Sequence, residues 1–375
     1  MTWNWQDPDW PNFVWQADLL AQAENLFLQQ SGIVVGASSH LGDEENDLLF
    51  IELMSNEATD TSQIEGETLD RSSVQASIRA ELGLAPGRRS KPAEAGIARI
   101  MVDLYRHIDA PLSKETLFNW HEMLMSARWD IASVGYFRRH DDPMEIVSGP
   151  AGRQKVHFVA PPSATIADEM ARFLQWFADT SPEGDKPLPA ITRAGIAHLW
   201  FETLHPFEDG NGRLGRAIVE KALAQCSGRS VITGVSGALR RQRKAYYAAL
   251  GAANRTLSIT PWLQWFAAIT LEAQQLTLRK VSFVIQKGRL LASTESAMNQ
   301  RQRKGILRMF EEGFEGFKDG LSAGKYMKIA GTPPATATRD LAELVSLGVL
   351  IRSGERKTTR YRLNINPAKE SAFAR

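Results

Sequence analysis

The residues best suited to chemistry lie together in one short stretch, His205 to Arg216, with the sequence HPFEDGNGRLGR. It combines an imidazole, a carboxylate, a glycine-rich turn and two guanidinium groups. Glycine lets the backbone approach an anion closely, and the N–H groups at the start of a following helix point toward it. Arginine forks match phosphate oxygens two at a time. Together these residue types predict a site that handles the phosphates of a nucleoside triphosphate.

Each side chain of this stretch suggests a role. His205 follows an apolar helix and, with an unperturbed pKa of about 6.5, is the natural general base, although a packed core histidine is the alternative. Asp209 can hold Mg²⁺, which proteins bind through one or two carboxylates plus substrate phosphates. Arg213 and Arg216 share one helix face. The chain has no GxxxxGK(S/T) loop, protein-kinase set or paired Cys/His zinc spacing, so the commoner nucleotide and zinc sites are excluded.

Composition limits the cell compartment and the partners. The 375 residues are 43% hydrophobic and carry a formal net charge of +1, so the whole molecule shows no attraction to nucleic acid or membranes. A single cysteine, Cys226, excludes an intramolecular disulfide and fits a reducing compartment. The start, MTWNWQDPDW, lacks the features of a signal peptide, and no apolar run approaches the roughly 18–20 residues of a membrane helix. We therefore expect a cytoplasmic protein with no membrane partner.

Apolar spacing predicts a mainly α-helical fold in three parts. Residues 1–96 form an N-terminal helical domain, with helices over 11–32, ending at Gly32, and over 43–67, and a boundary loop at 82–96. Residues 97–275 form a helical core in which a buried helix at 191–205 leads into the loop. One segment, 144–162, predicts a β-hairpin around the Gly-Pro-Ala-Gly turn at 149–152. A connecting helix at 271–296 leads to a third domain, residues 290–375.

The stretch 205–216 resembles the signature of the Fic family, HxFx(D/E)GNGRxxR, at every specified position. The resemblance implies a helical Fic core with a β-hairpin flap, and transfer of AMP from ATP to a Ser, Thr or Tyr hydroxyl of a protein. It implies that His205 takes the proton from the hydroxyl and that Asp209 holds Mg²⁺. The implied ATP-binding residues of the loop are Asp209, Gly210, Asn211, Gly212, Arg213, Leu214, Gly215 and Arg216.

The sequence TSQIEG at 61–66 resembles the inhibitory motif (S/T)xxxE(G/N), which one Fic subclass carries N-terminal to its core. The resemblance implies that Glu65, with Thr61 and Gly66 completing the motif, pairs with Arg216 and competes with the γ-phosphate for its guanidinium. An exposed glutamate beside a helix-ending glycine is the alternative.

The flap and the base pocket also follow from the resemblance. The second strand of the hairpin resembles the Fic flap, which aligns a target segment by main-chain pairing; a purely structural hairpin is the alternative. Residues 243–255 resemble the segment that lines the adenine pocket, whereas a tyrosine pair on a helix is more commonly core. The residues concerned are Val156, His157, Phe158 and Val159 in the flap, and Tyr246, Tyr247 and Asn254 in the pocket.

The C-terminal part differs in charge from the rest, because residues 301–375 carry 15 Lys and Arg against 8 Asp and Glu. Helical patterns at 301–313, 322–331 and 332–350, followed by an arginine-rich hairpin at 349–364, resemble a winged helix-turn-helix. The excess of positive charge fits contact with DNA phosphates, and docking to protein is the alternative. The residues expected to be exposed are Thr336, Thr338 and Arg339 on the recognition helix and Arg352, Arg356, Lys357 and Arg360 on the wing.

These observations lead to one functional prediction and two alternatives. We expect a protein adenylyltransferase that uses ATP and Mg²⁺, acts on a protein hydroxyl and is autoinhibited by Glu65. The first alternative is a Fic-type enzyme with another donor, such as UTP or CDP-choline, with kinase activity, or with AMP-removing activity. The second is a DNA-binding regulator whose core only senses nucleotide. A homodimer is left open.

Overall fold

The structure, a computed structural model, describes residues 2–38, 42–86, 90–148, 155–227, 232–294, 296–312, 316–317 and 319–365. The chain divides into two compact units. The first is built from residues 1–36 and 50–277, and the second from residues 37–49 and 278–375. The expected boundary near residue 97 lies inside the first unit, so the separation of an N-terminal domain from the core stays a prediction.

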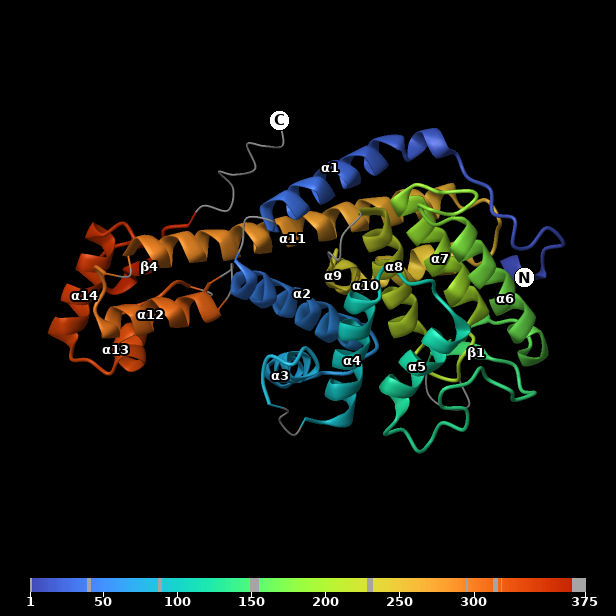
Figure 1. Cartoon of the computed structure of the whole chain (residues 1–375), viewed down its shortest axis with the longest axis horizontal. Helices are drawn as coiled ribbons and strands as arrows, with labels where there is room; N and C mark the ends of the chain where they lie inside the picture. Colours follow the sequence, from blue (N-terminus) through green and yellow to red (C-terminus); the bar gives the residue numbers. More distant parts are fainter. Residues whose placement is uncertain are drawn as a thin grey trace. The chain divides into compact units, whose positions relative to one another are not determined.

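Helices dominate the described chain (Figure 1). The elements up to the second hairpin strand are α1 (Ala21–Ser38), α2 (Asp43–Ile64), α3 (Arg71–Glu81), α4 (Pro92–Arg106), α5 (Lys114–Met125), β1 (Glu145–Ser148) and β2 (Lys155–Val159). They are followed by α6 (Ser163–Asp179), α7 (Ala190–Leu204), α8 (Asn211–Ser227), α9 (Val235–Arg241), α10 (Arg243–Ala253) and α11 (Thr260–Thr294). Short 3₁₀ helices lie at Asn4–Gln6 and Ala17–Leu19.

Helix α7 forms the centre of the first unit. All 15 of its residues are buried, so the helix that was expected to bury one face is surrounded by protein on every side. Glu24 of α1 caps its N-terminus by accepting hydrogen bonds from Ile191 N at 3.0 Å and Thr192 N at 2.8 Å. A carboxylate at this end also interacts favourably with the helix dipole. Helix α7 therefore offers a fixed base for the loop that follows it.

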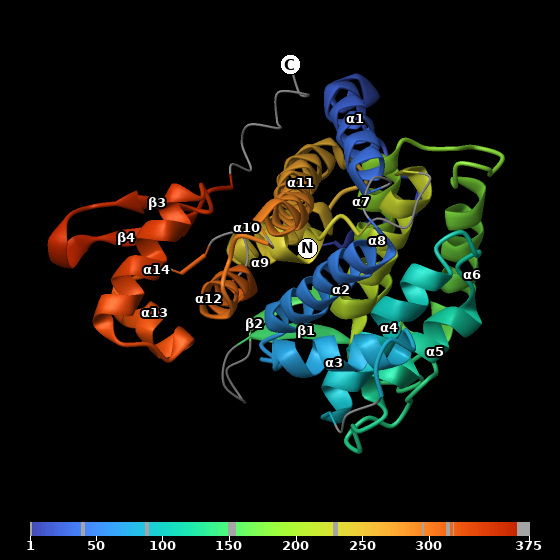
Figure 2. The same cartoon turned by 60° about the vertical axis from the view of Figure 1, so that its left-hand side comes forward.

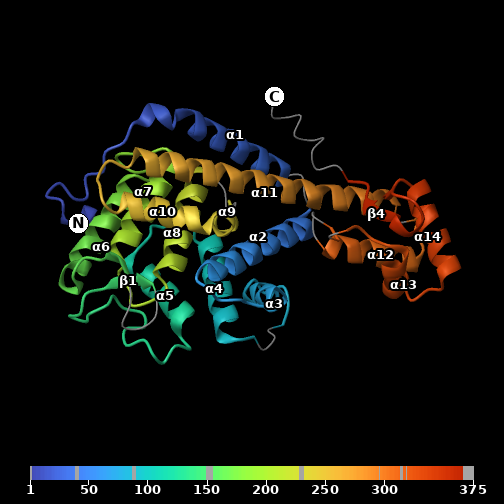
Figure 3. The same ribbon diagram turned by 180° about the vertical axis from the view of Figure 1, so that it is seen from behind.

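Helix α1 runs alongside α11, as two opposite views of the molecule show (Figures 1 and 3). Gln274 of α11 joins the two helices, since its Nε2 donates to Phe27 O at 2.9 Å and to Ser31 Oγ at 2.7 Å. The first helix of the chain is thus part of the same compact unit as the central helices.

Several expected helix limits are wrong. The first helix begins at Ala21 and not at residue 11, and it continues past Gly32 to Ser38. A Cβ at Gly32 would meet no atom within 4 Å, so space does not require glycine there. The loop expected at 82–96 is shorter, because α4 begins at Pro92. Proline is favoured in the first turn of a helix, where its missing N–H loses no partner.

The hairpin expected at 144–162 is confirmed. Strands β1 and β2 pair antiparallel, with Glu145 opposite Val159; the Gly-Pro-Ala-Gly turn at 149–152 lies outside the described residues. In β2 the side chains of Val156 and His157 are exposed, whereas Phe158 is buried and Val159 is half-buried. The hairpin therefore has few side chains packed into the core.

In its described residues, the second unit contains the last part of α11, three further helices and a two-stranded antiparallel sheet (Figure 2). The elements after α11 are α12 (Gln300–Glu311), α13 (Ala323–Ala330), α14 (Pro334–Ser346), β3 (Leu350–Ser353) and β4 (Arg360–Leu363), with a 3₁₀ helix at Arg356–Thr358. Buried Asp340 joins the helices, because it accepts from Tyr326 Oη at 3.0 Å and Arg301 Nε at 3.1 Å. The order of elements is the expected one, and the identification as a winged helix stays a prediction.

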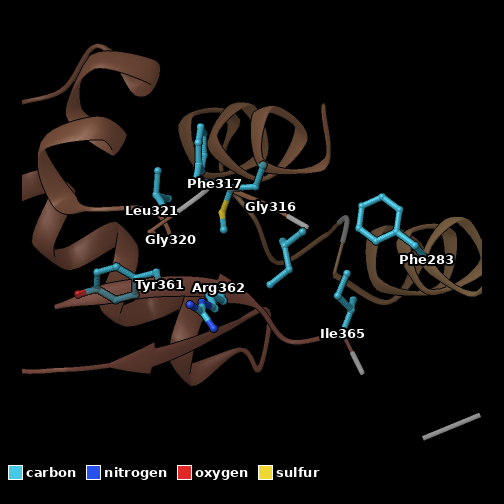
Figure 4. Close-up of a pocket in the computed structure, with 10 residues that line it drawn as sticks. Phe283, Gly316, Phe317, Gly320, Leu321, Tyr361, Arg362 and Ile365 are labelled. Atoms are coloured by element: carbon cyan, nitrogen blue, oxygen red, sulfur yellow. The ribbon is translucent and has the colours of Figure 1, made fainter. Parts of the chain in front are cut away.

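A cavity of about 60 Å³ lies in the second unit between the hairpin and the end of α12 (Figure 4). Apolar residues such as Phe317, Leu321 and Tyr361 line most of it. Ligand pockets are commonly about 300–1,000 Å³, so this cavity is too small for a nucleotide. Among the helices that the structure describes, none is both long enough and apolar enough to cross a membrane.

Candidate active site

The candidate site begins where α7 ends. His205 caps this helix in the left-handed region, with φ 45° and ψ 60°, and its N–H donates to Phe201 O at 3.0 Å. Residues other than glycine rarely adopt this conformation, which persists only where the surroundings enforce it. Since α8 begins at Asn211, residues 205–210 form a tight turn between two buried helices. The turn fixes the backbone from which the imidazole projects.

The glycines of the loop are required by conformation or by space. Gly210 has φ 83°, in the left-handed region. A Cβ on Gly212 would stand 2.3 Å from Glu65 Oε1, and a Cβ on Gly215 would stand 2.6 Å from Glu202 Oε1. Glycine therefore lets an acidic group approach the first turn of α8, where backbone N–H groups and the helix dipole favour negative charge.

The side chain of Asn211 closes the turn. Its Oδ1 accepts a hydrogen bond from Phe207 N at 2.9 Å, and its Nδ2 donates to Phe207 O at 2.8 Å. Both Asn211 and Leu214 are buried. The phosphate contacts that the resemblance implies for these two residues would therefore be made by their backbone atoms.

Both motif arginines are held by the segment at the end of α2. Arg216 Nη2 lies 2.6 Å from Glu65 Oε1 and 3.0 Å from Thr61 O, and its Nε donates to Thr61 Oγ1 at 2.6 Å. This is the pairing of Glu65 with Arg216 expected from the sequence. Arg213 Nη1 lies 2.8 Å from Glu67 Oε2, a contact that the sequence did not indicate. We call residues 61–67 the acidic segment.

The backbone of the acidic segment explains where its carboxylates lie. Helix α2 ends at Ile64, Gly66 adopts φ 85°, and Glu67 N donates to Ser62 O at 3.0 Å. A glycine in this conformation commonly ends a helix. A carboxylate at a helix C-terminus is disfavoured by the helix dipole, so the guanidinium of Arg216 is the group that stabilises Glu65 at this position.

Two buried donors of the arginines, Arg216 Nη1 and Arg213 Nε, have no hydrogen-bond partner. An unpaired buried donor of a charged group is costly and calls for an explanation, such as a ligand or a water. Phosphate oxygens are the acceptors that best match two guanidinium forks. The residues at the start of α8 therefore fit an anionic phosphate group.

Asp209, the expected metal ligand, has a side chain that is 41% exposed. Its Oδ2 lies 2.8 Å from Arg128 Nη1, and its Oδ1 lies 3.7 Å from Arg213 Nη2. In the described part of the chain, no cluster of three or more His, Cys, Asp or Glu residues is suited to a metal. One accessible carboxylate fits Mg²⁺ that takes its other ligands from phosphates and water.

A buried arginine, Arg138, organises the loop from outside the motif. Its Nε donates to His205 O at 2.8 Å, its Nη1 donates to Ser163 Oγ at 2.8 Å, and its Nη2 donates to Pro161 O and Leu204 O. Burial lowers the pKa of Arg138 to about 10, so the side chain stays charged at neutral pH. The guanidinium thus ties the end of α7 to the residues that follow β2.

The protonation of His205 follows from these surroundings. Burial, assisted by the positive charge of Arg138, lowers the pKa of His205 to about 4. The imidazole is therefore neutral at neutral pH and can accept a proton. The sequence predicted a base with an unperturbed pKa, and the structure differs because the ring is removed from water.

A second buried histidine, His121 of α5, supports the other side of the loop. Its ring stacks on Phe207 with the centroids 4.2 Å apart. Gly135 N donates to Nδ1 at 2.9 Å, so the proton belongs on Nε2, which lies 3.2 Å from Asp209 O. Burial lowers the pKa of His121 to about 4. A neutral ring with this one tautomer satisfies both contacts.

The residues implied for the base pocket separate into two groups. Tyr246 is buried, and its hydroxyl lies 2.8 Å from His198 Nε2. Asn254 is also buried, and its Oδ1 accepts from Thr203 Oγ1 at 3.2 Å. By contrast, Tyr247 is 43% exposed, and the guanidinium of Arg243 lies over its ring at 5.5 Å from the centroid. Of the three residues, Tyr247 is the one with the exposure that base stacking needs.

Sequence reasoning missed Arg138, His121, Glu67 and Arg128. Glu67 lies two positions beyond the predicted Glu65, and this short spacing is the local signal that could have indicated it. The other three reach the loop from α5 and the segment after it, far away in the sequence. No periodicity or spacing within those segments identifies them.

Comparison with known proteins agrees with this geometry. Residues 111–223 match the Fic/DOC family, and residues 3–84 match a domain of unknown function, DUF4172. The Fic/DOC match therefore includes the loop at 205–216. Proteins named protein adenylyltransferase Fic from Drosophila sechellia and Drosophila melanogaster are 30% identical to it over 187 residues. These matches cover 46% of this chain and only 36% of the length of each relative.

The fold has a counterpart among solved structures. A crystal structure of a Fic family protein from Desulfovibrio desulfuricans G20 aligns with a TM-score of 0.51 over 91% of this chain and 95% of that one. At 23% sequence identity this likeness shows the fold alone.

The buried histidines predict how stability depends on pH. Burial lowers the pKa of His198 to about 3, against about 6.5 in an unfolded chain. As the pH falls from about 6.5 toward 4, His198 binds a proton in the unfolded chain but not in the folded chain. The free energy of unfolding therefore decreases. We expect His198→Gln to reduce the slope of this free energy by up to about 1.4 kcal/mol per pH unit, with the largest difference below about pH 5.5.

The measurement is urea unfolding between pH 4.5 and 6.5, followed by tryptophan fluorescence, because all 10 tryptophans lie within residues 1–277. Burial raises the pKa of Glu202 to about 8 and gives it the opposite pH dependence. Both proteins contain Glu202, so the difference between them reports on the histidine. Equal slopes in the two proteins would show that His198 is protonated in the folded state.

Proposed function

We propose that this chain transfers AMP from ATP to a Ser, Thr or Tyr hydroxyl of a protein, and that the acidic segment restrains the reaction. One observation carries the proposal. The two arginines beside the glycine turn are neutralised by carboxylates of the chain itself, with Glu65 at 2.6 Å from Arg216 and Glu67 at 2.8 Å from Arg213. The relatives named protein adenylyltransferase support ATP as the donor and a protein as the acceptor.

The residues of the loop account for the steps of such a transfer. The neutral imidazole of His205 accepts the proton of the target hydroxyl, and the hydroxyl oxygen forms a bond to the α-phosphorus. The bond from that phosphorus to the bridging oxygen of the β-phosphate breaks, so pyrophosphate leaves and AMP is joined to the protein. Arg213 and Arg216 bind the outer phosphates, and the start of α8 binds the α-phosphate. Asp209 would hold Mg²⁺, which neutralises phosphate charge when bound.

In this proposal the acidic segment inhibits by occupying the place of the phosphates. Arg216 has two of its nitrogens bonded to Thr61 and Glu65, and the Glu65 carboxylate lies against Gly212. A γ-phosphate and this carboxylate would compete for one guanidinium in one volume. Each is an anion, so they also repel one another at close range.

Contacts elsewhere on α2 hold the segment in place. Asp60 Oδ1 lies 2.8 Å from Arg240 Nε, and the carboxylate of Glu57 accepts a hydrogen bond from Ser236 N at 3.1 Å. Both partners belong to α9. The inhibitory contact is therefore made by a helix that is anchored on the core, and relief requires either its displacement or the loss of Glu65.

Replacing Glu65 tests the proposed inhibition. We expect Glu65→Gly to raise self-modification and modification of lysate proteins by at least about tenfold, because a charge-assisted hydrogen bond worth about 1.5–3 kcal/mol no longer holds Arg216. The measurement is incorporation of label from ATP that is labelled in its α-phosphate. Modified peptides are then identified by mass spectrometry.

Two controls make the result specific. Gln63→Gly changes an exposed residue in the same last turn of α2 without touching Arg216, and we expect it to leave the rate unchanged. The double variant Glu65→Gly/His205→Ala is expected to lose transfer. Label incorporated from the γ-phosphate of ATP, or from UTP or CDP-choline in its place, would identify another donor chemistry. Equal rates for Glu65→Gly and the unmutated protein, both folded, would defeat the proposed inhibition.

For the second unit we propose contact with duplex DNA. Arg339 on α14 and Arg352, Arg356 and Arg362 along the β3–β4 hairpin are all exposed. The sequence also expected Thr336 and Thr338 on this surface; Thr338 is exposed and Thr336 is half-buried. Arg360 donates to Thr359 O at 2.9 Å, and the side chain of Lys357 lies outside the described residues. Exposed guanidinium groups along a hairpin that follows a helix suit phosphate contact.

Loss of two of these arginines tests the contact with DNA. We expect Arg352→Ala/Arg356→Ala in the full chain to weaken binding of a fluorescent duplex at low salt. The slope of log affinity against log salt should become shallower by about 0.9 for each lost phosphate contact. The control is Lys304→Ala, an exposed lysine of α12, which should leave the slope unchanged. No binding by the unmutated protein at low salt would refute this function.

A further inference from the structure

The first residues of the chain are bonded to the candidate site from one side. The indole Nε1 of Trp5 donates to Val159 O, at the end of strand β2, with a distance of 2.7 Å. The ring of Trp3 packs edge-on against Phe158, with the centroids 5.0 Å apart. Phe158 is the buried residue of β2, so the principal anchor of the flap packs against the N-terminal segment.

The same segment is bonded to the end of α7. The buried side chain of Asn4 donates from Nδ2 to Thr203 Oγ1 at 3.3 Å, and its backbone N–H donates to Asn254 O at 2.8 Å. Thr203 Oγ1 in turn donates to Asn254 Oδ1 at 3.2 Å. Thr203 precedes His205 by two positions, so this network meets α7 directly before the catalytic loop.

The segment is itself fixed at its far end. Val14 N donates to Leu257 O at 2.8 Å, and Val14 O accepts from Ile259 N at 2.9 Å. Between these points the indole of Trp10 donates to Glu169 Oε2 of α6 at 3.0 Å. We call residues 3–14 the tryptophan strap. It is bonded to the core at both ends and touches the flap at one of them.

The hairpin needs such support. A two-stranded hairpin is marginally stable in water unless its side chains pack against something else. Val156 and His157 are exposed, and Val159 is half-buried. The hydrogen bond from Trp5 and the ring contact from Trp3 therefore account for a large share of the interactions that stabilise β2.

We propose that Trp3, Asn4 and Trp5 are positioning residues that fix strand β2 relative to the end of α7. The strap thereby sets where a target hydroxyl is presented to His205. This inference rests on the proposed transfer of AMP to a protein, and it assigns a role to the start of the domain of unknown function at 3–84. If the strap only covered the core, it would stabilise all the elements that it contacts to the same extent. If it positions β2, loss of its contact with β2 has a specific effect on the hairpin.

Trp5→Phe and Trp10→Phe form a matched pair, because each keeps an aromatic ring and removes one indole N–H donor from the strap. Both are made in the full chain carrying Glu65→Gly. We expect Trp5→Phe to accelerate hydrogen exchange of the β1 and β2 amides by about fivefold, the effect of losing one hydrogen bond. Trp10→Phe should leave these amides unchanged. Trp5→Phe should also slow self-modification while the affinity for ATP, measured by titration calorimetry, stays the same.

Three results would overturn the inference. These are unchanged exchange of the hairpin in Trp5→Phe, equal acceleration in both variants, or a loss of ATP affinity equal to the loss of self-modification. Exchange is measured without turnover, so its outcome does not depend on transfer activity. Failure of the proposed function would have a different signature, because the Glu65→Gly parent would then incorporate no AMP. Hydrogen exchange of the β1 and β2 amides would still show whether the strap fixes the flap.

Discussion

The charge of Arg216 governs the candidate site. Its side chain is 1% exposed, and a guanidinium removed from water needs an anion and hydrogen-bond acceptors close by. Here Glu65 and Thr61 supply them, which places the end of α2 against the start of α8. A triphosphate would meet the same need. In the proposed mechanism this one buried charge has two competing anionic partners, and Glu65 already lies against Gly212. This requirement links the glycine in the loop, the glycine turn after Ile64 and the position of the acidic segment.

Arg138 imposes a second constraint, on the shape and the protonation of the loop. Its guanidinium donates to the carbonyl groups of Leu204, His205 and Pro161 and to the hydroxyl of Ser163. Its positive charge adds to the effect of burial on His205, whose pKa falls to about 4. The residue that helps to hold His205 in its left-handed conformation thus also helps to keep the imidazole neutral. Phosphates bound nearby would offset this positive charge and favour the imidazolium as it forms.

Structure that neighbouring residues determine could be predicted from the sequence, whereas most contacts between distant residues could not. The helical pattern, the hairpin and the loop at 205–216 can be read from spacing, because neighbouring residues determine them. The contact of Glu65 with Arg216 came from the resemblance of two short motifs, since no spacing relates residues 151 positions apart. Arg138 and His121 were missed because an isolated arginine or histidine gives no sign that tertiary packing will bury it. Gly32 was misjudged for the same reason: α1 packs along α11, and that packing outweighs the weak preference of glycine to end a helix.

Both ends of the N-terminal region contact the candidate active site. Its first residues contact β2 and the end of α7, and the acidic segment contacts both arginines at the start of α8. A region that contacts strand β2 at one end and the two motif arginines at the other is not an appendage to the Fic domain. This arrangement explains why residues 1–36 and 50–277 form one compact unit. It also separates two properties physically. The contacts of the strap with α6, α7 and the segment after α10 do not involve α2. A displacement of α2 that frees Arg216 would therefore leave the position of the flap unchanged.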